Sequence, residues 1–173
     1  EANMARLPQR IVCLSTETVE VLYLLGEEAR IAGISGFTTH PPRARKEKPK
    51  VSGFSSAKIE RILAVEPDLV LAFSDLQGDI ARDLIQAGAA VHVFNHRSVD
   101  GILAMIETVG RLVGAEGRAL ALVAELERTI ATERANGEAR AARLGHRPKV
   151  YFEEWNEPLI TGIRWVSELI GIA

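Results

Sequence analysis

The segment 51–73, VSGFSSAKIERILAVEPDLVLAF, combines a strand, a helix and a second strand with very short connections. Ser56 supplies a helix cap, and Pro67 stops the helix before the second strand begins. Two strands joined through a helix in this way lie parallel in one sheet. The polar loop 53–56 therefore falls at a strand's carboxyl end, where open parallel sheets bind their ligands.

The same alternation of apolar strands and helices runs through the whole chain before His96. Helices are expected to begin after Ser15 and at Gly78, and to end at Gly26 and Gly88. The expected strands are 10–14, 30–34, 51–52, 68–73 and 91–95. This order predicts an α/β fold in which a parallel, helix-flanked sheet forms an N-terminal lobe over 1–98.

The pattern changes to helices in the segment 99–147. Its second helix, expected over 116–143, would span roughly 40 Å at about 1.5 Å per residue, which indicates a linking helix rather than a crossover in a sheet. A strand at 149–153 and a helix at 164–170 predict the start of a second α/β lobe over 148–173. The alternative is that this last segment folds back to complete a single sheet.

A lone strand and helix leave their apolar faces in water, so the predicted second lobe is incomplete. A missing segment, or a second copy of the chain in a dimer, would have to cover these faces.

The overall composition excludes several classes of protein. The chain is 47% hydrophobic and 25% charged, which is typical of a globular protein, and its net charge of −2 argues against a nucleic-acid partner. The single cysteine, Cys13, lies in an apolar strand and is expected to be a buried thiol. No apolar run approaches the ~20 residues of a membrane span.

The N-terminal sequence leaves two locations open. Residues 1–10 lack the apolar segment of a secretory signal. Either a signal has been removed and the protein is periplasmic or otherwise extracytoplasmic, or Met4 is the native start and the protein is cytoplasmic. In the second case the residues before Met4 are a tag remnant.

Motifs for catalysis and metal binding are lacking. The sequence has no phosphate-binding glycine loop, no nucleophile elbow and no HExxH motif. Glu153 and Glu154 are adjacent on an expected strand, so their side chains would point to opposite faces and could not form a carboxylate pair. The four histidines show no metal-ligand spacing, although His40 or His96 could approach a bound metal complex. We therefore expect no catalytic residues, no resident metal and no catalytic cofactor.

The tract 51–73, the long helix and the restart KVYFEEW at 149–155 together resemble the ABC-importer substrate-binding proteins for iron-siderophores, haem and vitamin B12. The most specific match is IERILAVEPDLVLA at 59–72, and the ending EEWNEPLITGIRWVSELIG resembles the cobalamin-binding branch. The family's LISLxPxxTE motif appears in altered form at 12–20, without its proline. The chain is shorter than is usual for this family, which implies that the second lobe is truncated.

This resemblance implies a rigid two-lobe protein that holds its ligand between the lobes and delivers it to an ABC permease with its ATPase. The implied ligand is cobalamin-like first, and haem or a ferric siderophore second. A cytoplasmic corrinoid-binding carrier or sensor with the same fold is the alternative, and an α/β enzyme is a third class. In the family, a glutamate matching Glu60 pairs with permease arginines; otherwise Glu60 is a solvated helix residue.

The loops that follow the strands should gather at one edge of the sheet, opposite residues 153–158 of the second lobe. Phe54 and Trp155 are expected to contact the ligand, because aromatic faces bury much area against a macrocycle. The alternative for both residues is packing in the core, which is the preferred interpretation for Trp165.

The basic run 43–50 is expected to be a solvated loop, or else to attract a phosphate- or carboxylate-bearing ligand. The predicted ligand-binding residues are Ser15, Glu17, Thr39, His40, Phe54, Ser55, Ser74, Asp75, His96, Glu154, Trp155 and Asn156.

Overall fold

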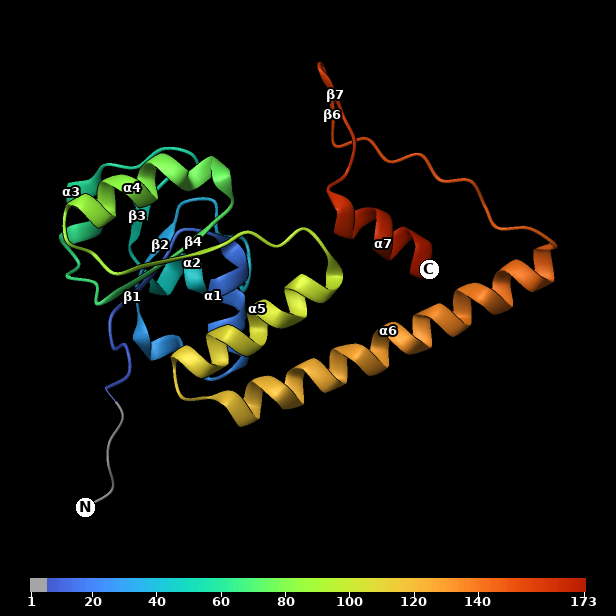
Figure 1. The fold of residues 1–173 in the computed structure, drawn as a ribbon, viewed down its shortest axis with the longest axis horizontal. Coiled ribbons are helices and arrows are strands. Elements are labelled where there is room, and N and C mark those ends of the chain that lie inside the picture. Colours follow the sequence, from blue (N-terminus) through green and yellow to red (C-terminus); the bar gives the residue numbers. More distant parts are fainter. Residues whose placement is uncertain (1–5) are drawn as a thin grey trace. The chain divides into compact units, whose positions relative to one another are not determined.

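The computed structural model describes residues 6–173, which separate into two compact units (Figure 1). The first unit contains the described residues up to Asn95 together with Met105–Ala119. The second contains His96–Ala104 and Leu120–Ala173. Met4, the alternative start, lies outside the described residues, as do the residues before it.

The first unit is built on a five-stranded sheet in which all neighbouring strands are parallel, as the sequence predicts. The strand order is β3-β2-β1-β4-β5, so the chain moves outward from β1 on one side and then restarts with β4 on the other. The strands are β1 (Ile11–Cys13), β2 (Ile31–Ser35), β3 (Lys50–Ser52), β4 (Leu69–Phe73) and β5 (Val91–Phe94).

Helices cover both faces of this sheet. On one face, fully buried Val12 and Val70 pack with Ile62 and Leu84 of two helices, α3 and α4. Successive strand residues point to opposite faces, so Cys13 lies on the other face, where α1 packs against β1 and β2. The helices of this part of the chain are α1 (Thr16–Leu24), α2 (Ala44–Glu47), α3 (Ile59–Leu63), α4 (Gly78–Gln86) and α5 (Val99–Leu112), with 3-10 turns η1 (Glu28–Arg30) and η2 (Asp75–Gln77).

Two local predictions for this unit are confirmed. Cys13 is fully buried, and burial raises the pKa of its thiol to about 12, so it stays protonated and packs as a small apolar group. The helix α4 stops just before Gly88, whose φ of +88° is a conformation that other residues rarely adopt.

The predicted cap at Ser56 is wrong. The helix α3 begins at Ile59, after Lys58, and Ser56 makes no side-chain cap to it. Instead the Ser56 carbonyl accepts a hydrogen bond of 2.9 Å from the Gly53 N–H. That bond closes a turn over residues 53–56, so the backbone cannot become helical until the turn has ended.

The basic run 43–50 is not an irregular loop, because it forms α2 and leads into β3. Ala44 is fully buried and anchors the short helix. The Arg43 guanidinium lies 4.6 Å from the Tyr23 ring centre and 3.2 Å from a Glu28 carboxylate oxygen. The Tyr23 hydroxyl donates to Glu47 at 2.6 Å, and burial together with this bond raises the pKa of Tyr23 to about 12.

The second unit contains most of the long helix α6 (Glu116–Leu144), then β6 (Trp155–Asn156), β7 (Leu159–Ile160) and α7 (Arg164–Ile172). At 29 residues, α6 is about 44 Å long, as expected for a linking helix. The strands β6 and β7 pair only with each other, in an antiparallel hairpin separate from the five-stranded sheet. The alternative of a single completed sheet is therefore wrong.

The strand expected at 149–153 is also wrong, because these residues form no strand. Within the part of the chain that the structure describes, no strand lies beside them to supply the missing backbone partners. The apolar side chains of this segment remain exposed, among them Val150 at 60% and Tyr151 at 70%. None of the helices described here has the length and hydrophobicity that a bilayer crossing requires.

The carboxylate of Glu168 makes one of the contacts that attach α7 within the second unit. Glu168 accepts a hydrogen bond of 2.7 Å from the Val99 N–H, at the first residue of α5, and another of 2.7 Å from Arg164. The bond from the Val99 backbone is the main cause that lowers the pKa of Glu168. A negative charge is favourable at this position because the first N–H groups of a helix lack internal partners.

A partly exposed ion-pair cluster joins the first turn of α6 to the segment before β2, within the first unit. Glu27 accepts from Arg30 at 2.5 Å and also from Arg118. Burial alone would raise the pKa of Glu27, but the hydrogen bonds from the two arginines outweigh it and lower the pKa.

We expect Glu27→Gln to lower the free energy of unfolding by about 1.5–3 kcal/mol at pH 7, because hydrogen bonds to a charged group are lost. A carboxyl pKa that is lower in the folded state stabilises above the unfolded value of about 4.3 and loses this contribution as pH falls. Urea unfolding at pH 7 and pH 3 should show the difference between the two proteins shrinking in acid. The exposed Glu20→Gln is the control, and an equal loss in that variant would contradict the prediction.

Candidate functional site

The sheet order places a topological switch point between β1 and β4. From these adjacent strands the chain continues in opposite directions across the sheet, and open parallel sheets commonly bind ligands at the carboxyl ends of the strands beside such a point. Ser15 follows β1 and Ser74 follows β4, and both are almost fully buried. This edge of the sheet is therefore the candidate ligand site.

A side chain that the sequence did not single out, Gln77, joins three segments at the switch point. It is fully buried, and its amide oxygen accepts from the Phe73 N–H at 2.8 Å. Its amide nitrogen donates to the carbonyls of Leu14 and Phe54, both at 2.9 Å. Gln77 therefore fixes the end of β1, the end of β4 and the loop that carries Phe54 relative to one another.

Ser74 holds a strained backbone at the same edge. Its φ of 73° and ψ of 156° lie in a region that glycine favours. Its hydroxyl donates to Asp75 at 2.8 Å and accepts from the Leu76 N–H at 3.3 Å, while its own N–H donates to the Phe94 carbonyl at 2.7 Å. These bonds stabilise the strained residue and orient the predicted residue Asp75, which is exposed.

The first residue of α1, Thr16, is joined to the loop that follows β2. Its hydroxyl oxygen accepts from the Thr39 N–H at 3.1 Å and from the His40 N–H at 3.4 Å. The His40 ring nitrogen Nδ1 lies 3.1 Å from the Thr39 hydroxyl. The structure thus brings Thr39 and His40 of the β2 loop beside the start of α1, which Ser15 precedes and whose first turn contains Glu17.

Several buried polar atoms at this edge have no hydrogen-bond partner among residues 6–173. They are the hydroxyls of Ser15, Thr38 and Ser52 and one carboxylate oxygen of Glu17. An unsatisfied buried polar group costs about 1–3 kcal/mol, so water or a polar ligand is needed to satisfy these atoms. Thr38 and Ser52 were not among the predicted residues, since a hydroxyl in a polar loop gives no distinguishing pattern.

Aromatic side chains follow both β2 and β3. Phe54 is partly buried and its neighbour Ser55 is exposed, while Phe37, which the prediction missed, is 70% exposed. A Cβ atom at Gly53 would lie 3.7 Å from the Phe37 ring. Phe37 follows its strand as Phe54 follows β3, so the reasoning applied to Phe54 could have identified it.

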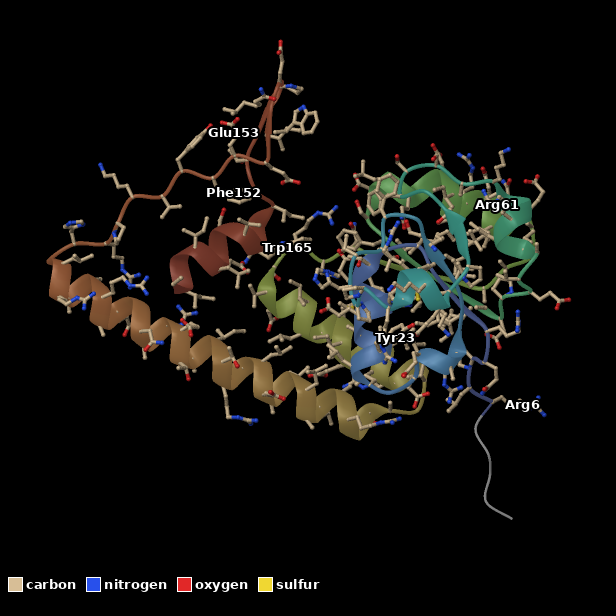
Figure 2. All side chains as sticks on the ribbon, turned by 180° about the vertical axis from the view of Figure 1, so that it is seen from behind. Arg6, Tyr23, Arg61, Phe152, Glu153 and Trp165 are labelled. Carbon is tan, nitrogen blue, oxygen red and sulfur yellow. The ribbon has the colours of Figure 1, made fainter. Side chains whose placement is uncertain are left out.

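The remaining predicted residues belong to the second unit. His96 is partly buried, with its ring centre 5.7 Å from that of Trp165 at the start of α7 (Figure 2). Trp165, expected in the core, is half-buried and packs against this histidine. Glu154, Trp155 and Asn156 are exposed at the β6–β7 hairpin, and the Trp155 indole donates to the Glu157 carbonyl at 2.9 Å.

Histidine, cysteine and carboxylate side chains form no group of three or more that could hold a metal ion within residues 6–173. Glu60 is exposed on α3 and forms no ion pair with a basic side chain within residues 6–173. It is thus available on the surface of the first unit.

The sequence of residues 11–173 matches the family described as periplasmic binding protein. The chain belongs to this family. A cobalamin-binding protein of Halobacterium salinarum is 32% identical over 148 residues, which cover 84% of this chain and 39% of that protein. An uncharacterized ABC transporter substrate-binding lipoprotein of Bacillus subtilis is 29% identical over 131 residues, covering 73% and 41%.

A solved structure supports the fold of this periplasmic binding protein chain. The periplasmic vitamin B12 binding protein of Vibrio cholerae superposes with a TM-score of 0.77 at 20% identity, covering 95% of this chain and 64% of that one. The chain spans about two-fifths of the length of the two sequence relatives above. The fold and the resemblance predicted from the sequence are confirmed.

We expect Gln77→Met to lower the free energy of unfolding by about 2–4 kcal/mol, because methionine fills a similar volume but leaves buried backbone groups without a partner. Urea denaturation measures the loss, and amide exchange at Phe73 should accelerate. Gln86→Met at the exposed end of α4 is the matched control. Equal stability of the two variants would show that the three hydrogen bonds do not matter.

Proposed function

We propose that this chain is the substrate-binding component of an ABC importer and binds a metal-tetrapyrrole or metal-chelate ligand. Cobalamin is the first candidate, and haem or a ferric siderophore is the second. The observation that carries the proposal is the combination of aromatic rings with unsatisfied hydroxyls at the switch-point edge of the sheet. The relative named as a cobalamin-binding protein supports the order of the candidates.

The chemistry of this edge matches that of a large metal complex. A corrin ring has a broad apolar face and a rim of amide groups. Phe37 and Phe54 would cover apolar area, and the hydroxyls of Ser15, Thr38 and Ser52 would bond to polar groups of the rim. His40, whose ring lies 3.1 Å from the Thr39 hydroxyl on the same loop, is the side chain of this edge that we propose approaches the metal.

Trp155 is the residue of the second unit that we propose contacts the ligand, together with its neighbours Glu154 and Asn156. Its indole is 60% exposed, although a tryptophan normally buries most of its large surface. Its cross-strand neighbour Ile160 is 46% exposed and Leu159 is 60% exposed, and a contiguous exposed apolar patch of this kind is typical of a contact surface. His96 is the fourth residue proposed from this unit.

Delivery to a permease is the second part of the proposal. Glu60 is exposed on α3 and is the carboxylate we propose to pair with permease arginines. The relative named as an ABC transporter substrate-binding lipoprotein supports this partner and an extracytoplasmic location. Both parts of the proposal concern binding and involve no catalytic step.

We expect a titration of the complete gene product and of the 173-residue chain with cobalamin, haem and a ferric siderophore to quench tryptophan fluorescence, most strongly with cobalamin. Phe54→Ala and Trp155→Ala should each raise the dissociation constant about 5- to 30-fold, the effect of losing about 1–2 kcal/mol of apolar contact. Tyr151→Ala, an exposed aromatic outside the proposed site, is the control. If none of the three ligands binds the complete product at micromolar concentration, the ligand class is wrong.

We expect Glu60→Arg to reduce uptake of the ligand into cells at least tenfold while leaving the dissociation constant of the ligand unchanged, since the residue acts only in docking. Uptake of labelled ligand and binding by the purified protein are measured in parallel. Glu66→Arg, an exposed carboxylate just after α3, is the matched control. Normal uptake with Glu60→Arg would remove this residue from the docking surface.

A further inference from the structure

A pocket of the first unit lies between the edge strand β3 and the helix α3. Its volume is about 400 Å³, within the usual range for small-molecule sites. Because β3 pairs only with β2, this side of the sheet is not covered by another strand. The pocket is lined by Lys50, Val51, Ser52, Gly53, Ser56, Ala57, Lys58 and Arg61, none of which is acidic.

The positive charges of this pocket are not compensated. Lys50 donates to the Arg45 carbonyl and Arg61 donates to the Lys50 carbonyl at 3.3 Å, both of which are neutral acceptors. Within residues 6–173 no carboxylate forms an ion pair with Lys50, Lys58 or Arg61. In contrast, Arg43 of the same basic stretch pairs with two glutamates.

The distribution of charge along the chain sharpens this contrast. Residues 43–61 contain seven lysines and arginines and two glutamates, a formal charge of +5, whereas the whole chain carries −2. Three of these seven basic residues, Lys50, Lys58 and Arg61, line the pocket. A local field of this kind attracts anions even when the protein as a whole is slightly acidic.

Neutral donors complete the pocket. The Ser52 hydroxyl is buried and has no hydrogen-bond partner among the described residues. A Cβ atom at Gly53 would lie only 2.9 Å from the Ser56 hydroxyl, so glycine is required for the turn 53–56 to close this tightly. The closed turn keeps the Ser56 hydroxyl in the lining. Three cations and two hydroxyls suit a compact oxyanion that accepts several hydrogen bonds.

We propose that the β3–α3 pocket is an anion site for a phosphate group, supplied either by inorganic phosphate or by the headgroup of an anionic phospholipid. Arg61, on α3 (Figure 2), supplies a planar donor, and Lys50 and Lys58 supply point charges. This site goes beyond the proposed function. Of the residues that line it, only Ser52 is also proposed to contact the metal complex.

The first test is a phosphate titration of the full chain followed by amide NMR spectra at constant ionic strength, with chloride as the balancing anion. We expect saturable shifts centred on Gly53, Ser56 and Arg61. Shifts that are equally large with chloride, that fail to saturate, or that are spread over all basic residues would overturn the proposal.

Variants that each remove one positive charge distinguish phosphate binding in this pocket from diffuse attraction to basic residues. Lys58→Gln and Arg61→Gln, both at exposed positions, should each weaken phosphate binding about tenfold. Lys46→Gln removes the same charge from the same stretch but lies outside the pocket lining, and should leave the affinity nearly unchanged. Equal weakening by all three variants would show that only diffuse attraction exists, and this would overturn the site.

Vesicle sedimentation distinguishes the two sources of phosphate. Retention on phosphatidylglycerol but not phosphatidylcholine vesicles, abolished by inorganic phosphate and by Arg61→Gln, assigns the pocket to a lipid headgroup. Phosphate-dependent NMR shifts without vesicle retention assign it to free phosphate. If neither signal is seen, the proposal is wrong, and cobalamin titration of the same sample tests the metal-complex site separately.

Discussion

The buried amide of Gln77 is the contact on which the geometry of the candidate site depends. A parallel sheet with a switch point has diverging loops at adjacent strands, and nothing in the sheet itself holds those loops together. Gln77 supplies that connection, since its oxygen bonds to the end of β4 and its nitrogen bonds to the carbonyls of Leu14 and Phe54. Because the side chain is fully buried, water cannot replace these bonds without opening the core.

Local sequence patterns were sufficient to predict the strands of the first unit, although the short helix α2 was expected to be a loop. The run 69–73 is wholly apolar, as expected for a strand buried on both faces, and it is bounded by Pro67 and by polar residues after Phe73. The strand order was not predictable in the same way, because parallel pairing is decided by contacts between residues far apart in the chain. The prediction of a helix cap at Ser56 failed because this residue forms a turn with Gly53 instead. The prediction of a strand at 149–153 failed because no neighbouring strand pairs with these residues within the described part of the chain.

The site itself was predicted less completely than the sheet that carries it. Knowing that loops follow the strands was enough to expect Ser15, Phe54 and Ser74 at one edge. It could not identify Gln77, because an isolated glutamine has no periodicity and its role appears only when β1 and β4 are adjacent. Thr38 was missed for a related reason, since its burial depends on how the β2 loop folds over Thr16.

The net charge of the whole chain is a weak constraint on function, because it does not describe how charge is distributed along the chain. A total of −2 argues against a broad electrostatic surface, but it is compatible with a segment of +5 around one pocket. The turn 53–56 belongs to both candidate sites, because Gln77 holds the Phe54 carbonyl while Gly53 and Ser56 line the cationic pocket. An anion that ordered this turn would also restrict the position of Phe54. The two sites would then be coupled through backbone that they share, with no need for a change elsewhere in the sheet.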